Sequence, residues 1–119
     1  MAGWKDCFQE KKEIVLVTCS KKSVPNANVV VSLGFVDNKL LIADCMMKTT
    51  LKNLEENPKV CVIGGYYRIV GDAEVLQSGK YFDIAAKILS NQDKTLKLKN
   101  AISISVKGVF DLEKSQKIL

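Results

Sequence analysis

The chain has 119 residues, of which 47% are hydrophobic and 26% are charged, and its formal net charge is +5. This length fits one domain with a single core, and apolar runs such as 29–31 are far shorter than the roughly 18 residues of a membrane-spanning helix. Residues 1–12 carry charges throughout, so we expect no signal peptide and a cytoplasmic protein. The moderate positive charge, without a nucleic-acid-binding motif, favours a solvated basic surface and no nucleic-acid partner.

The cysteine and histidine content restricts the chemistry that the chain can perform. The cysteines form no CxxC pair, so we interpret them as reduced, buried thiols and expect no metal site. They are Cys7, Cys19, Cys45 and Cys61. The sequence contains no histidine, which removes the commonest general base and the usual catalytic triads. Because no side chain stands out as an acid or base, the catalytic residues stay unassigned.

Hydrophobic patterning in the first part of the chain predicts one helix and then three strands. Residues 2–12 have the spacing of a short amphipathic helix, with Trp4 as a packing residue. Residues 14–19 are continuous and rich in β-branched side chains, which is typical of a buried strand. A second strand runs from residue 25 to 35, where Gly34 indicates a bulge or a sharp bend. A tight polar turn then leads into a short apolar strand that begins at Leu40.

The stretch 40–58 joins that apolar strand, through a turn, to a short helix. The helix is expected to start at Lys48-Thr49-Thr50 and to end at Asn57-Pro58, because Asn tolerates a left-handed cap and Pro cannot continue a helix. Free backbone N–H groups at such a start, with Lys48 alongside, suit an anion such as a phosphate. The alternative interpretation is a threonine cap that needs no ligand.

The second half of the chain predicts further strands around one longer helix. The expected strands are 60–63, 66–70, 73–76 and 101–110, and glycines mark a turn or bulge at 71–72 and a bend at 108. The helix spans 79–90, and the lysine-rich segment 91–99 is either a loop or a continuation of it. About six strands joined mostly by hairpins, with interior glycines, favour a curved and closed antiparallel sheet. The fold class is therefore α+β and mainly β.

The segment KTTLKNLEENPKVCV is similar to the phosphate-binding helix of a known family. Together with a first strand ending in Thr-Cys-Ser and a turn into Pro25-Asn26, it makes the chain resemble the pyridoxamine 5′-phosphate oxidase-like FMN-binding split barrels from about residue 14 to 112. The resemblance implies that residues 1–119 form a single domain, a six-stranded antiparallel split β-barrel with short flanking helices. It also implies a homodimer that binds two FMN molecules across its interface.

The resemblance further implies which residues bind the cofactor. Asn28 stands where many members have a phosphate-binding arginine, and the next three residues match the strand whose backbone lines the flavin ring. Two residues at the end of the following strand lie beside the ring, and the two threonines match the pair that holds the phosphate. The implied cofactor-binding residues are Asn28, Val29, Val30, Val31, Ala43, Asp44, Lys48, Thr49 and Thr50. Tyr66, Tyr67 and Arg68 are candidates to reach a flavin from the neighbouring subunit.

The function implied by this resemblance is that of an FMN-binding flavoprotein, in the first place a flavin-dependent oxidoreductase whose cofactor carries the redox chemistry. The chain looks too short for the substrate-binding C-terminal segment of full pyridoxamine 5′-phosphate oxidases, so that activity is not assigned. One alternative keeps the fold and binds the deazaflavin F420 or haem, although haem is disfavoured because histidine is absent. The other alternative is a flavin-binding or sensing module without turnover. The small-molecule substrate and the electron donor stay unidentified.

Overall fold

The computed structural model describes residues 3–45 and 47–119. Its strands are β1 Glu13–Cys19, β2 Pro25–Val36, β3 Lys39–Asp44, β4 Lys59–Gly64, β5 Tyr67–Leu76, β6 Asn100–Asp111 and β7 Gln116–Lys117. Its helices are the 3-10 helix η1 Trp4–Phe8 and the α-helices α1 Thr49–Glu56 and α2 Lys80–Gln92. Within the described ranges, no helix is long and apolar enough to cross a membrane. The cytoplasmic location stays a prediction.

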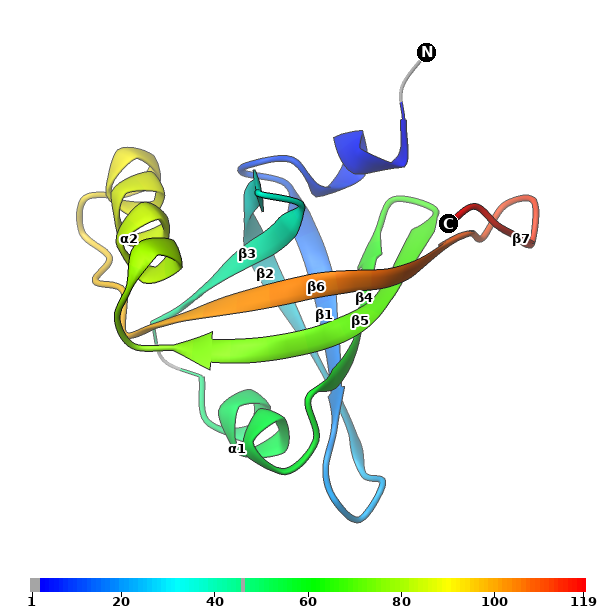
Figure 1. Ribbon diagram of the computed structural model, residues 1–119, viewed down its shortest axis with the longest axis horizontal. Coiled ribbons are helices and arrows are strands. Elements are labelled where there is room, and N and C mark those ends of the chain that lie inside the picture. Colours follow the sequence, from blue (N-terminus) through cyan, green and yellow to red (C-terminus); the bar gives the residue numbers. More distant parts are fainter. Residues whose placement is uncertain (1–2, 46) are drawn as a thin grey trace.

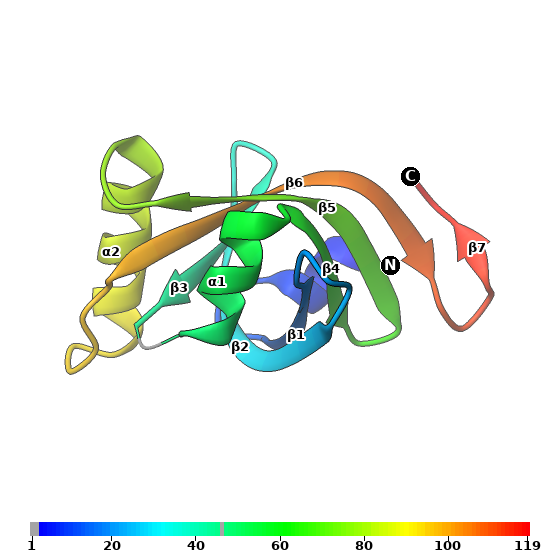
Figure 2. The ribbon, with the colours of Figure 1, turned by 90° about the horizontal axis from the view of Figure 1, so that it is seen from below.

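Six strands close into an antiparallel barrel, which confirms the predicted fold class. The hydrogen-bonded order is β3-β2-β1-β4-β5-β6, and β3 pairs back with β6 to complete the ring. β5 and β6 run side by side for most of their length (Figure 1). The extra strand β7 pairs with the end of β6, at the opposite end of the molecule from α2 (Figure 2). α1 packs against β1, β2 and β5, whereas α2 packs against β2, β3 and β6.

The continuous apolar pattern of β3 reflects burial on both of its faces. Leu40 and Ile42 point into the barrel core, and Leu41 between them contacts a second cluster under α2, which includes Ala85 and Leu89. All three β3 side chains are fully buried. A strand that is covered on both sides reads as an unbroken apolar run rather than an alternating one. β3 is thereby fixed between the barrel core and α2, and its end at Asp44 leads directly into the candidate site.

Two irregularities in the ladders coincide with the glycines expected to mark bends. The β2–β3 register shifts between Ser32 and Phe35, and Gly34 in that gap has a φ of +88°. The β5–β6 register shifts between Val70 and Gly71. A Cβ atom on Gly71 would lie 2.2 Å from the backbone oxygen of Ser105, so only glycine allows this close approach. Such bulges bend and twist strands, which a small closed barrel requires.

The structure corrects the predicted helix at 2–12. η1 covers only Trp4–Phe8, after which Gln9 is extended and Lys11 adopts a φ of +76°. The predicted start at residue 2 lies outside the described residues. The chain turns early because Phe8 is fully buried and must enter the barrel mouth. Trp4 packs edge-on against the Phe8 and Phe35 rings, which confirms its role in packing.

The two α-helices lie close to their predicted ranges, with one correction at the end of α1. Asn57 is the C-terminal cap residue but has a φ of −150°, so the predicted left-handed cap is wrong. Its side-chain oxygen instead accepts a hydrogen bond of 3.1 Å from the Lys59 backbone N–H, which directs the chain into β4. α2 extends two residues beyond the predicted end, to Gln92, and the rest of the segment up to residue 99 is a loop.

Candidate functional site

The start of α1 meets β2 through three neutral polar side chains, here called the polar triad: Asn26, Asn28 and Thr50. The Asn26 amide donates hydrogen bonds to Asn28 Oδ1 at 2.8 Å and to Thr50 Oγ1 at 3.3 Å. The Thr50 hydroxyl donates in turn to Asn28 Oδ1. Thr50 is buried, because α1 packs on β1 and β2, while Asn28 is exposed. The buried Thr50 side chain therefore holds the two asparagine amides in place, and the amide of Asn28 is at the surface.

The first turn of α1 has no side-chain cap. Lys48 is the N-cap residue and makes no side-chain hydrogen bond to the helix. The Thr50 hydroxyl is used in the polar triad, and Thr49 is exposed. The alternative interpretation, in which a threonine merely caps the helix, is therefore wrong.

Asp44 holds the loop between β3 and α1. Its side chain is fully buried, and its Oδ1 accepts a hydrogen bond of 2.7 Å from the Met47 backbone N–H. Oδ2 accepts a second hydrogen bond, of 2.6 Å, from the Asn100 side-chain amide on β6. The Asp44 backbone oxygen accepts from the Lys99 N–H. Both carboxylate oxygens are thus used within the protein, and a contact of Asp44 with a cofactor stays a prediction.

A cavity of about 530 Å³, here called the ring cavity, lies along β2 between the β3–α1 loop and the end of α2. Four of the residues implied by the family resemblance line it together: Val29, Val30, Val31 and Ala43. Most of its other walls are apolar or come from α2 and the loop that follows: Lys11, Leu33, Cys45, Met47, Leu89, Gln92, Asp93 and Leu96. Its volume is within the usual range of small-molecule sites.

The thiol of Cys45 in the ring cavity is held in its protonated form. Burial raises the pKa of this thiol, and the nearby Asp44 carboxylate raises it further. A raised pKa lowers the fraction of reactive thiolate at neutral pH. This agrees with the interpretation of Cys45 as an inert wall of the site.

A second, more polar cavity of about 500 Å³ lies next to the polar triad and is here called the lysine cavity. It is bounded by the β1–β2 turn and by the outward side of α1, and Asn26 belongs to both the triad and this cavity. Its lining residues are Ser20, Lys21, Lys22, Val24, Pro25, Asn26, Thr49, Lys52, Asn53 and Glu56. Sequence reasoning did not identify Lys21, Lys22 and Lys52 as site residues, because nothing in the local pattern of residues 20–23 places this segment beside a helix that begins 26 residues further on.

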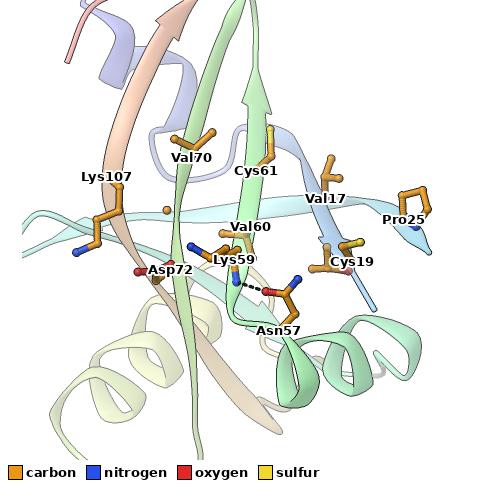
Figure 3. A pocket seen from close by; sticks show the side chains of 12 residues that line it. Val17, Cys19, Pro25, Asn57, Lys59, Val60, Cys61, Val70, Asp72 and Lys107 are labelled. Atoms are coloured by element: carbon orange, nitrogen blue, oxygen red, sulfur yellow. Dashed lines mark hydrogen bonds between the residues drawn. The ribbon is translucent and has the colours of Figure 1, made fainter. Parts of the chain in front are cut away.

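A third cavity, of about 610 Å³, lies on the outer wall of the barrel over β1, β4 and β5 (Figure 3). Cys19, Cys61, Asp72 and Lys107 line it, but none of the implied cofactor residues does. Burial raises the pKa of the Cys61 thiol, which the Arg68 guanidinium lowers to a smaller extent. All four cysteines are free and half-buried. Because none of the implied cofactor residues lines this cavity, we do not include it in the candidate site.

The structure brings most of the implied cofactor residues to one side of β2. Asn28 and Thr50 meet in the polar triad, and Thr49 lines the lysine cavity. Val29, Val30, Val31 and Ala43 line the ring cavity, whereas Asp44 is fully buried and does not. Lys48 is exposed at the start of α1. Of the candidates for a contact across an interface, Tyr66 is 69% exposed at the β4–β5 turn. Among the residues that the structure describes, no group of three or more acidic, cysteine or histidine side chains could hold a metal ion.

Comparisons with known proteins agree with this architecture. A family model described as pyridoxamine 5′-phosphate oxidase matches residues 2–113. An uncharacterised protein of Methanocaldococcus jannaschii is 32% identical over 112 residues, which make up 87% of this chain and 75% of the relative.

Three solved structures share the fold at low sequence identity. HupZ of Group A Streptococcus has a TM-score of 0.84 and 22% identity over 100% of both chains. An FMN-binding protein from Syntrophomonas wolfei has a TM-score of 0.70 and 23% identity, covering 82% of this chain and 74% of that one. An F420 reductase has a TM-score of 0.71 and 14% identity, covering 93% and 98%. At these identities the likeness shows the fold alone.

Proposed function

The chain belongs to the pyridoxamine 5′-phosphate oxidase family, and from this premise we propose that it is a flavoprotein that binds FMN at the interface of a homodimer. The observation that carries the proposal is the ring cavity, where Val29, Val30, Val31 and Ala43 come together beside the polar triad. The mostly apolar walls suit a flat aromatic ring, which gains free energy when it leaves water. The triad supplies amide and hydroxyl groups for the polar chain that joins the ring to its phosphate.

The positions of the two cavities along β2 support a cofactor that lies lengthwise on this strand. Val30 borders the ring cavity and Asn26 borders the lysine cavity, and the two are four residues apart on one strand. At a rise of roughly 3.3 Å per residue, about 13 Å separates them. An elongated cofactor can therefore lie along β2 with its apolar end in the ring cavity and its charged end near α1.

A homodimer is supported by an apolar outer face on the barrel. It consists of two cross-strand rows, Val29, Val15 and Ile63 in one and Ala27, Val17, Cys61 and Val70 in the other. Val29 is 70% exposed, and the row members on β1, β4 and β5 are half-exposed. A contiguous apolar surface of this kind marks an interaction site. Because Val29 also lines the ring cavity, a second copy on this face would close the open side of the site.

Bound FMN would supply hydride or electron transfer, and the protein would orient the ring and exclude water. The titratable side chains that line the ring cavity are Lys11, Cys45 and Asp93, and the raised pKa of the Cys45 thiol makes it a poor proton donor. We assign none of the three a role in proton transfer. We therefore place the oxidoreductase activity in the cofactor and its substrate. A binding or sensing module without turnover is distinguished by the failure of bound flavin to become reduced by nicotinamide cofactors.

A second candidate is the deazaflavin F420, which one structural neighbour carries in its name. The observation that favours it is the lysine cavity, since three ammonium groups there suit a cofactor with several negative charges. F420 and FMN share a three-ring apolar head, so both fit the ring cavity by the same argument.

The experiment that tests the proposal is a titration of purified, flavin-free protein with FMN, riboflavin and F420. We expect FMN to quench in fluorescence and to raise the melting temperature by several degrees, because a ligand at 100 times its Kd adds about 2.7 kcal/mol to the free energy of unfolding. A larger effect of F420 than of FMN would favour the second candidate. Protein that responds to none of the three compounds would contradict the proposed function.

A further inference from the structure

The polar triad carries no formal charge, although it lies where the charged end of the proposed cofactor would point. Its three members satisfy one another, with the Asn26 amide donating to both partners and the Thr50 hydroxyl donating to Asn28. A phosphate monoester carries about −1.5 to −2 charges at neutral pH and binds most strongly to charged donors. The triad alone therefore leaves most of that charge unbalanced.

Three lysines line the lysine cavity next to the triad. Lys21 and Lys22 reach it from the β1–β2 turn, and Lys52 reaches it from α1. The cavity contains one carboxylate, that of Glu56, and its Oε1 accepts a hydrogen bond of 2.9 Å from the Lys21 backbone N–H. Among residues 3–45 and 47–119, Lys80 and Asp37 form the one ion pair with a nitrogen–oxygen distance within 4.0 Å. Lys21, Lys22 and Lys52 therefore form no such pair. The cavity thus has an excess of positive charge.

The turn that carries two of these lysines is held in a fixed shape. The Ser20 hydroxyl accepts hydrogen bonds from the Lys22 and Val24 backbone N–H groups, at 3.2 and 3.0 Å. The Ser20 N–H donates to the Val24 oxygen, and Ser23 has a φ of +66°. Together with the link from Lys21 to Glu56 on α1, these bonds fix the turn against the helix. The backbone that carries Lys21 and Lys22 is therefore held in place beside α1, which carries Lys52.

We propose that the lysine cavity is an anion site, in which Lys21, Lys22 and Lys52 bind the phosphate end of the cofactor. This inference rests on the proposed function for the identity of the ligand, but the anion site itself does not. The cavity adjoins the triad through Asn26, and Thr49, the neighbour of Thr50, also lines it. It lies at the opposite end of the β2 site from Val31. Its volume of about 500 Å³ exceeds what a single phosphate fills, so it also accommodates a diphosphate or a longer anionic tail.

The test compares two triple variants of the full chain. The first is Lys21→Gln, Lys22→Gln and Lys52→Gln, which keeps the length of the side chains and removes their charge. The control is Lys87→Gln, Lys114→Gln and Lys117→Gln, which removes the same charge from exposed positions on α2 and near β7. Affinities for FMN and for riboflavin, which lacks the phosphate, are measured at one ionic strength. We expect the cavity variant to lose about tenfold or more in FMN affinity and less than about twofold in riboflavin affinity.

Each outcome separates this inference from the proposed function. If wild-type protein binds FMN and the cavity variant keeps the same ratio of FMN to riboflavin affinity, the inference is wrong and the flavin site stands. An equal loss in the control variant also overturns it, because a general charge effect would then explain the result. FAD and F420, which carry longer anionic tails, are titrated in parallel. If such a tail also occupies the cavity, the wild-type protein binds these ligands more tightly than FMN and the cavity variant loses this gain.

If the wild-type protein binds no flavin, the proposed function fails and inorganic pyrophosphate decides the anion site. A rise in melting temperature with pyrophosphate that the cavity variant loses and the control keeps would support the site. The absence of any pyrophosphate effect on the wild-type protein would overturn it.

Discussion

At the residue scale, Asp44 is a buried carboxylate with a structural task at the edge of the candidate site. Its two oxygens accept from the Met47 backbone and from Asn100, which ties the β3–α1 loop to β6. The side-chain oxygen of Asn100, Oδ1, is also buried, and it has no hydrogen-bond partner among the described residues. If the Asn100 amide turns over, it therefore loses only the hydrogen bond from its nitrogen to Asp44.

Two substitutions at Asp44 are therefore expected to differ. Asp44→Ala leaves the Met47 N–H and the Asn100 amide without an acceptor and should lower the free energy of unfolding by about 2–3 kcal/mol. Asp44→Asn keeps the acceptor for Met47, and its new amide can donate to Asn100 Oδ1 once that side chain turns over. We expect it to lose less than about 1.5 kcal/mol. Urea unfolding of the three proteins measures both values, and equal losses would show that the charge itself is required.

At the element scale, the bend in β5 depends on a backbone contact that no side chain can replace. The close approach of Gly71 to Ser105 lies at the register shift between β5 and β6. This shift leaves Lys107 as the extra residue on β6, because Val70 pairs with Gly108 and Gly71 pairs with Val106. The bend shared by β5 and β6 is therefore set at one point.

Gly71→Ala should destabilise the barrel, because the new Cβ atom can be accommodated only if β5 moves away from β6. We expect a loss of about 1–3 kcal/mol in the free energy of unfolding. Gly3→Ala is the matched control, since a Cβ atom there has no neighbour within 4 Å, and its effect should stay within about 0.5 kcal/mol. Thermal or urea unfolding followed by circular dichroism checks both. A neutral Gly71→Ala would mean that the bulge relaxes freely.

The elements that sequence reasoning predicts well are those with a strong local signal. α1 follows from its Lys-Thr-Thr start and Asn-Pro end, and β6 follows from the alternation of residues 101–106. The N-terminal helix is predicted too long because the burial of Phe8, a tertiary effect, ends it early. The left-handed cap at Asn57 fails for a similar reason, since its side chain bonds to Lys59 instead.

The candidate site divides in the same way. The implied cofactor residues of the ring cavity are three neighbours on β2 and Ala43 near the end of β3, so one family resemblance covers them. The polar triad and the lysine cavity depend on contacts between residues 22 to 35 positions apart, such as Asn28 with Thr50 and Lys21 with Glu56. No local pattern encodes such contacts, and a lysine in a polar turn looks like any solvated charge. The wall that α2 adds to the ring cavity is non-local as well.

At the scale of the whole molecule, the outer face and the ring cavity meet on β2. A strand in a closed barrel has one face in the core and one face outside, and here the outside carries valine where solvated strands carry polar residues. Both cross-strand rows extend from β2 across β1 to β4, and the second row continues to Val70 on β5. A face of this kind stabilises an association by removing apolar surface from water.

The prediction at this scale is that the protein is a dimer through the outer face and that its cofactor site depends on the dimer. Light scattering should give twice the 13.2 kDa chain mass. Val17→Lys, in the centre of the outer face, should yield monomers, because an ammonium group in an apolar interface loses its hydration without a partner. Val17 does not line the ring cavity, so weaker FMN binding by this variant would reflect the missing partner.

Leu119→Lys is the control for an exposed apolar residue outside the two cross-strand rows, with 62% of its surface accessible, and should leave the dimer intact. A Val17→Lys protein that stays dimeric would place the interface elsewhere. A monomeric variant with unchanged FMN affinity would mean that one barrel holds the flavin alone. If instead mass and affinity fall together, the open side of the ring cavity, next to the exposed Val29, is the side on which the second subunit contributes to the flavin site.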